Sequence, residues 1–143
     1  MEFFYEAIVM AYLTRNKKAF VCPQFSIEDG TNADWRCPDF VALDFEKARV
    51  IVAEVSTGSD LGRIAKKADQ IYKHSIPKIK MQLARIKSIP DLAGWNVRMQ
   101  MSIREDLTGD LEKRIKKLGF EADVISLEHT FRRWKPEWTI EQR

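Results

Sequence analysis

The chain has 143 residues, of which 45% are hydrophobic and 31% charged, and its formal net charge at pH 7 is only +3. A chain of this length can bury a core of its own, so we expect residues 1–143 to form a single domain. There is no low-complexity tract, two cysteines are too few for a disulfide framework, and no apolar stretch approaches the roughly 20 residues that cross a bilayer.

The first thirteen residues, MEFFYEAIVMAYL, are apolar but differ from a signal peptide. Glu2 and Glu6 interrupt the apolar run, no basic region precedes it, and no small-residue cleavage site follows it. We therefore expect a soluble, cytoplasmic protein without a membrane contact. The same pattern predicts a helix over residues 2–15 that is apolar nearly all the way round and hence buried.

The next segments indicate strands. Residues 19–27 are β-branched and aromatic, with a proline that suits an edge or a bulge, and a polar loop is expected over 28–36. Residues 39–45 and 48–56 are two apolar runs joined by a two-residue polar link, which predicts a β-hairpin. The second run is almost continuously apolar, as in a central strand that is covered on both faces.

The second half of the chain alternates helical and strand patterns, in the order helix 60–74, a further helical segment to 87 after a break or kink at Pro77, strand 94–103, helix 104–119 and strand 121–128. Helical connections place successive strands parallel in one sheet. The complete order, α-β-β-β-α-(α)-β-α-β, predicts an α/β protein with a mixed central sheet flanked by helices on both sides. The tail 129–143 is basic and aromatic and has no assigned structure; it extends a nucleic-acid groove, caps the sheet or forms a dimer contact.

Two carboxylates interrupt the apolar hairpin. With the turn at Glu46 and Lys47, residues whose numbers sum to about 93 face each other across the strands, as Asp39 and Glu54 do. Like charges this close persist where a proton or a cation is shared between them. Because Mg²⁺ commonly takes one or two protein carboxylates plus substrate phosphate, the pair predicts a metal site. The alternative is that the acids lie at a strand edge in water or pair with a lysine.

Positive charge is concentrated after the hairpin. Between Arg63 and Lys87 there are eight lysines or arginines and one acid, Asp69. Such local bias is the electrostatic footprint of a phosphate-binding face, although a solvated helix surface produces the same pattern. The candidate nucleic-acid-binding residues are Arg63, Lys66, Lys67, Lys73, Lys78 and Lys80.

The sequence resembles a known superfamily at these positions. PD at 38–39, the hairpin, and EVS at 54–56 resemble the PD-(D/E)xK nuclease motif, and the element order resembles the restriction-endonuclease-like αβββαβ core over most of the chain. The resemblance implies that Asp39 and Glu54 bind Mg²⁺, with Mn²⁺ as an alternative ion, and that Glu6 supplies a third acid from the first helix.

One position departs from the motif, because Ser56 stands where the superfamily has a lysine. Some members supply this lysine from the following helix, and Lys67 is the best candidate because it shares a helix face with Gln70. VSTG followed by Gln70 resembles the RecB-type branch, and the small size is similar to that of archaeal Holliday-junction resolvases. The resemblance thus implies a set of catalytic residues consisting of Glu6, Asp39, Glu54, Ser56, Lys67 and Gln70.

The function implied by the resemblance is Mg²⁺-dependent endonuclease or exonuclease activity on the phosphodiester bonds of DNA. RNA is left open as a substrate, and a homodimer is expected only by analogy with the resolvase-like branch. The alternative is a nuclease-fold module that has no catalytic activity and binds nucleic acid or a protein partner, since Ser56 leaves a cationic role vacant.

Overall fold

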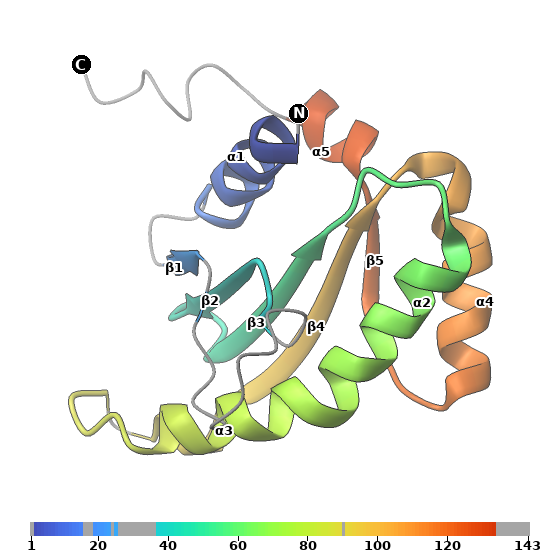
Figure 1. Cartoon of the computed structure of the whole chain (residues 1–143). Coiled ribbons are helices and arrows are strands. Elements are labelled where there is room, and N and C mark those ends of the chain that lie inside the picture. The colour runs from blue at the N-terminus through green and yellow to red at the C-terminus, as the bar shows by residue number, and fades with distance from the viewer. Residues whose placement is uncertain (1, 16–18, 24, 26–36, 90, 134–143) are drawn as a thin grey trace, which may run out of the picture.

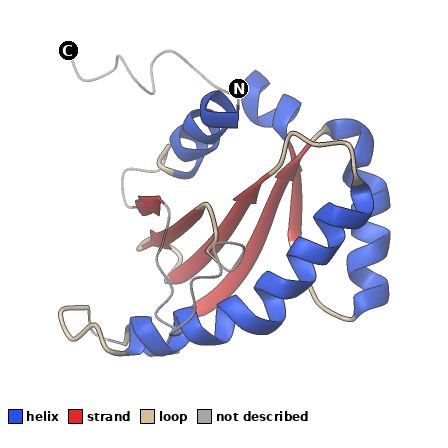
Figure 2. Ribbon diagram, in the orientation of Figure 1, coloured by secondary structure: helices blue, strands red, loops and turns tan. Residues whose placement is uncertain are grey.

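The protein is an α/β domain with a five-stranded mixed sheet between helices (Figures 1 and 2). The structure, a computed structural model, describes residues 2–15, 19–23, 25, 37–89 and 91–133. The predicted polar loop over 28–36 and the tail from residue 134 onwards lie outside the described residues. None of the described helices has the length and apolar character needed to cross a membrane.

The strands lie in the sheet in the order in which they occur in the chain: β1 (Ala19–Pro23), β2 (Phe40–Asp44), β3 (Arg49–Val55), β4 (Asn96–Ile103) and β5 (Asp123–Ser126). The pairs β1–β2 and β2–β3 are antiparallel, whereas β3–β4 and β4–β5 are parallel. This confirms the prediction that hairpin-linked strands come first and helical crossovers follow.

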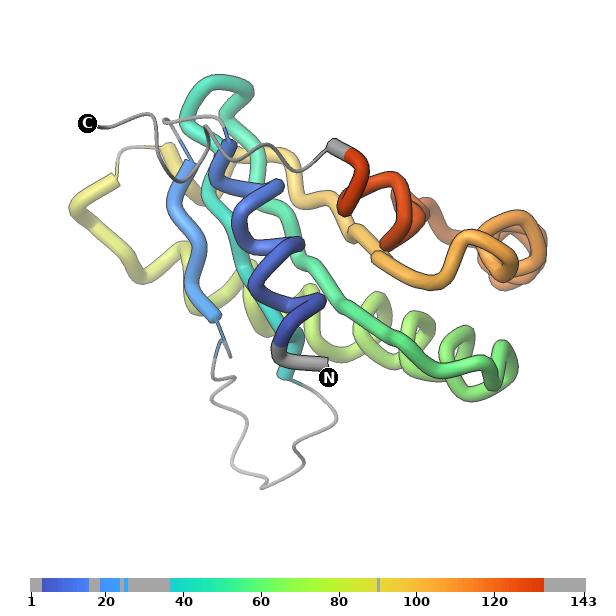
Figure 3. Tube along the Cα trace, turned by 90° about the horizontal axis from the view of Figure 1, so that it is seen from above, coloured from blue at the N-terminus to red at the C-terminus, as the bar shows by residue number. Residues whose placement is uncertain are grey.

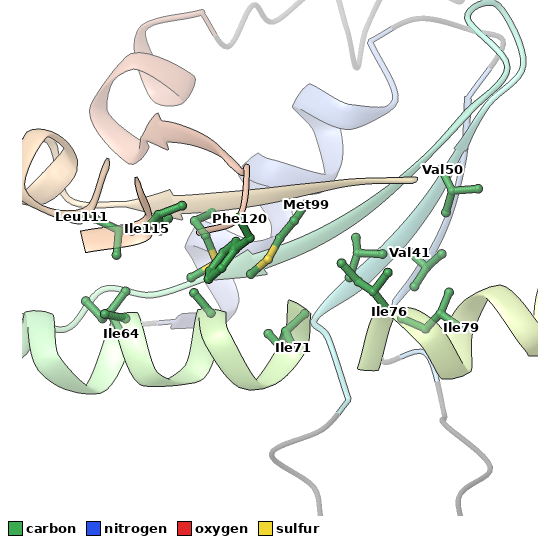
Figure 4. Close-up of a cluster of buried hydrophobic side chains, with 14 of the residues drawn as sticks. Val41, Val50, Ile64, Ile71, Ile76, Ile79, Met99, Leu111, Ile115 and Phe120 are labelled. Atoms are coloured by element: carbon green, nitrogen blue, oxygen red, sulfur yellow. The ribbon is translucent and has the colours of Figure 1, made fainter. Parts of the chain in front are cut away.

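Helices cover both faces of the sheet (Figure 2). The helices α1 (Glu2–Leu13) and α5 (Leu127–Arg133) contact each other on one face (Figures 1 and 3). The other face carries α2 (Leu61–Gln70), α3 (Ile76–Ala84) and α4 (Thr108–Leu118). The larger core lies on this second face, where Ile64 of α2 and Leu111 of α4 are directed at the sheet (Figure 4).

The predicted break at Pro77 is replaced by a continuous helical run. Between α2 and α3 the chain forms a π-helical turn, Ile71–Ser75, in which the Ile76 amide donates to the Ile71 carbonyl. Pro77 then occupies the first turn of α3. The backbone N–H groups in the first turn of a helix need no acceptor within that helix, so proline, which lacks an N–H, is tolerated there. The wider π turn joins the two helices without a break.

The last predicted strand is too long. It ends at Ser126, and residues 127 and 128 belong to α5, which the sequence interpretation missed. Ser126 acts as the helix cap, since its hydroxyl oxygen accepts a hydrogen bond from the His129 amide at 2.8 Å. A serine in this position satisfies one of the unpaired amides of the first helical turn and therefore favours helix over strand.

Candidate active site

The two predicted carboxylates, Asp39 and Glu54, are held close together by hydrogen bonds across the hairpin. The hairpin register pairs Phe40 with Ala53, so that Asp39 and Glu54 are the next facing positions. The Asp39 amide donates to Glu54 Oε2 at 3.1 Å, and the Val55 amide donates to Asp39 Oδ2 at 2.8 Å. Each side chain therefore accepts a hydrogen bond from the backbone of the opposite strand, and the predicted proximity of the two acids is confirmed.

Glu54 is a buried acid with an unusual proton affinity. It is only 1% exposed. Burial, followed by the negative charge of Asp39, raises its pKa to about 8, although the neighbouring Lys67 acts in the opposite direction. The cause is that both a low-dielectric surrounding and a nearby like charge disfavour the ionised carboxylate.

Lys67 reaches this carboxylate from α2. Its ammonium forms an ion pair with Glu54 Oε1, the oxygen that accepts no hydrogen bond from the backbone. The lysine side chain is 41% exposed, so its ammonium lies between a buried acid and solvent. The structure thus places Lys67 over the end of β3, where the sequence interpretation expected a cation to replace the one missing at Ser56.

A cavity of about 370 Å³ opens beside this ion pair, at the carboxyl end of β3 and the start of α2. Glu54, Ser56, Arg63 and Lys67 contribute to its lining. Ser56 continues the parallel pairing, since its amide donates to the Ser102 carbonyl at 3.0 Å. The cavity therefore presents two cationic side chains, the hydroxyls of Ser56 and Ser59 and the carboxylate of Asp60 beside the buried Glu54.

The structure does not bring Glu6 into this group. Side chains alternate along β3, so that Val52 and Glu54 face α2 while Ile51 and Ala53 pack on the side covered by α1, which carries Glu6. Among the described residues there is no cluster of three or more histidine, cysteine, aspartate or glutamate side chains. Gln70, at the end of α2, is half-buried and does not line the cavity.

The predicted basic face divides into separate environments. Arg63 lines the cavity at Glu54, whereas Lys66 lines a second cavity between α2 and α4. Lys73 is engaged with Asp69, one turn earlier, with 3.0 Å between Lys73 Nζ and Asp69 Oδ1. This pairing makes Lys73 a weaker phosphate-binding candidate than Arg63.

The remaining predicted cations, Lys78 and Lys80, lie further along on α3, half-buried and exposed respectively. Sequence reasoning missed Arg114 and Lys117 of α4, which share the second cavity with Lys66. The available signal was the run KRIKK at 113–117, but its proximity to α2 is a tertiary contact that periodicity does not encode.

The donor set at the hairpin fits a hard divalent cation. Asp39 and Glu54 each use one carboxylate oxygen for a backbone hydrogen bond, and the second oxygen of Glu54 has the Lys67 ammonium as its counter-charge. Two carboxylates are the number that Mg²⁺ commonly takes from a protein, with water and substrate phosphate completing its coordination. When Glu54 is ionised, its buried oxygen needs a positive charge beside it, which Lys67 supplies in this structure and a metal ion could also supply.

Comparison with known proteins found no matching family model, no matching curated protein and no matching solved structure. The case for a function therefore depends on the geometry of the Asp39–Glu54 pair, on Lys67, and on the cavity beside them.

Proposed function

We propose that this protein is a Mg²⁺-dependent phosphodiesterase that cleaves DNA, with Asp39 and Glu54 as the metal ligands. The observation that carries the proposal is the reciprocal Asp39–Glu54 hydrogen bonding with the Lys67 ammonium on the remaining Glu54 oxygen, beside an open cavity. The mixed sheet and its helices are compatible with a restriction-endonuclease-like core, and we propose this finer fold assignment together with the activity.

Each residue of the cavity has a role under this proposal. Mg²⁺ or Mn²⁺ held by Asp39 and Glu54 supplies positive charge at the scissile phosphate and lowers the pKa of the attacking water. Lys67 exchanges its contact with Glu54 for the phosphate and stabilises the charge that develops in the transition state, the role that Ser56 cannot fill. Arg63 binds an adjacent phosphate oxygen, and the Ser56 hydroxyl orients water or phosphate.

Other parts of the sequence interpretation stay predictions. Glu6 and Gln70 do not line the cavity described above and keep only the roles that the resemblance implies. The sequence leaves RNA open as a substrate, and a homodimer and a cytoplasmic location stay expectations from the sequence.

The test is cleavage of labelled linear, nicked and four-way DNA in Mg²⁺, in Mn²⁺ and in EDTA. Asp39→Asn keeps an acceptor for the Val55 amide but removes the charge, and we expect it to reduce cleavage to the EDTA background. Lys67→Met keeps the apolar stem and should lower the rate by roughly 10²–10³-fold, the usual loss for a group that stabilises transition-state charge. Asp44→Asn is the matched control, because Asp44 is another aspartate of the same hairpin, buried at the far end of β2 from the half-buried Asp39.

The outcomes separate the candidate functions. Cleavage that survives Asp39→Asn would refute the metal site, and cleavage that survives Lys67→Met would remove Lys67 from the mechanism. If the wild-type protein cleaves no substrate but binds DNA tightly in a salt-sensitive manner, the alternative of a non-catalytic nuclease-fold module replaces the enzyme. The Lys67–Glu54 ion pair favours that alternative specifically, since it neutralises Glu54 without a metal ion.

A further inference from the structure

A second cavity, of about 450 Å³, lies between α2 and α4, two helices that pack against each other on the larger core. Its lining consists of Ala65, Lys66, Asp69, Arg114, Lys117 and Leu118. The cavity is separate from the Asp39–Glu54 site, and three of its six lining residues are cations from two different helices.

These cations have no acidic ion-pair partner among the residues that the structure describes, since no ion pair there joins Lys66, Arg114 or Lys117 to an acid. The one acid of the lining, Asp69, is already paired with Lys73 at 3.0 Å. Like charges that converge on a concave surface repel each other and concentrate a positive potential there, which favours an anionic ligand.

Apolar side chains in the lining narrow the kind of anion further. Ala65 is buried, and Leu118 is a large apolar side chain that is 43% exposed. A lining that combines cations with apolar side chains suits a chain in which sugar rings alternate with phosphates. Inorganic phosphate alone would leave the apolar side chains without a contact.

The two cavities adjoin along α2. A Cβ placed on Gly62 would lie 3.8 Å from Arg114 Nη1 and 3.5 Å from Asp60 Oδ1, so the guanidinium lies over the first turn of α2. Asp60 and Arg63, from the same turn, line the cavity at Glu54. Positive side chains therefore continue from the candidate active site over α2 to α4.

We propose that the α2–α4 cleft binds the sugar–phosphate backbone of DNA, next to the phosphodiester that enters the cavity at Glu54. Arg114 and Lys117 each contact a backbone phosphate, and Leu118 contacts sugar. The inference rests on the proposed function for the identity of the partner, but it needs neither metal nor catalysis.

The experiment is fluorescence anisotropy of a labelled duplex in EDTA, titrated with protein over a range of salt concentrations. Each phosphate contact contributes about 0.9 to the slope of log K against log salt, which is roughly an eightfold change in affinity between 1 M and 0.1 M salt. The double variant Arg114→Ala/Lys117→Ala should therefore bind roughly 60-fold more weakly at 0.1 M salt, with a slope smaller by about 1.8.

Lys116→Ala is the matched control. Lys116 is an exposed lysine of the same last turn of α4, but it does not line the cleft. Its removal changes the net charge and the helix end as Lys117→Ala does, and it should leave affinity within about twofold of wild type because no phosphate contact is lost.

Four results would overturn the inference. The first three are no duplex binding by the wild type, an affinity of the double variant within twofold of wild type, and an equal loss in Lys116→Ala. The fourth is displacement of the duplex by polyglutamate at equal charge, which would favour an acidic protein partner. A wild-type protein that binds the duplex through Arg114 and Lys117 but cleaves no substrate refutes only the proposed enzyme, whereas cleavage without any contribution from Arg114 and Lys117 refutes only this cleft.

Discussion

Replacing Glu54 with glutamine tests the electrostatics on which the candidate site depends. In the native state, burial and the charge of Asp39 raise the pKa of Glu54 from 4.5 to about 8 against the opposing effect of Lys67. Between these two pKa values the folded protein holds a proton that the unfolded chain releases. The contribution of Glu54 to stability is therefore fully present below pH 4.5 and is lost as pH rises through 8.

The size of the effect follows from the number of protons involved. One proton bound only in the native state lowers the free energy of unfolding by about 1.4 kcal/mol for each pH unit. Over the three units from pH 5 to pH 8 the loss amounts to about 4 kcal/mol as an upper bound. Glu54→Gln has no titrating group at this position and should lack this slope, so that its stability relative to wild type increases steadily with pH.

The assay is urea unfolding of both proteins at pH 5, 6, 7 and 8 in EDTA. Titrating groups that lie away from Glu54 are common to the two proteins and cancel in the difference. Glu112→Gln, at an exposed site on α4, is the matched control and should follow the wild-type curve. Parallel curves for wild type and Glu54→Gln would refute the reasoning, because they would mean that Lys67 keeps Glu54 ionised in spite of its burial.

Three further predictions concern stability. Burial acts to raise the pKa of Asp44, but hydrogen bonds from the Lys47 amide and Arg49 outweigh it, so the pKa is lowered. Asp44→Asn should therefore lower the free energy of unfolding by about 2 kcal/mol at pH 7, as measured by urea unfolding. This loss should shrink as the pH falls below 3.8, because the wild-type carboxylate is then protonated. Gly119 ends α4 with φ of +85°, so Gly119→Ala should lower stability by about 1 kcal/mol, whereas an unchanged midpoint would contradict the strained geometry. Ile79 is fully buried, and Ile79→Ala should cost about 2–5 kcal/mol in the same assay, a loss that would be absent if α3 did not pack on the sheet.

The parts of the fold that the sequence predicted are those set by local rules. A short turn fixes hairpin register, and register together with the alternation of side chains determined that Asp39 and Glu54 face each other. The parallel strands followed from the helical connections between them. The helix after Ser126 was missed because β5 has only four residues and its last residue, Ser126, is also the cap of α5. A segment this short does not show where a strand pattern ends and a helix pattern begins.

Tertiary contacts explain what the sequence could not supply. Glu6 stands out in an apolar helix, but which face of the sheet that helix covers is decided by packing, and α1 covers the face opposite to Glu54. Arg114 and Lys117 lie about fifty residues from Lys66 in the chain and reach it only because α2 and α4 pack together. The charge count along the chain covered only residues 63–87 and so missed Arg114 and Lys117, which the structure brings to the same cavity as Lys66.

Ser56 shows how a linear motif and a spatial site differ. Ser56 follows the end of β3 and lines the same cavity as Glu54, and the Lys67 ammonium enters that space from α2. Ile64 and Ala68 are buried against the sheet, which holds Lys67 at the border of that face and directs it to the strand end. Position 56 therefore departs from the motif that the sequence resembles, yet a positive charge still lies beside Glu54.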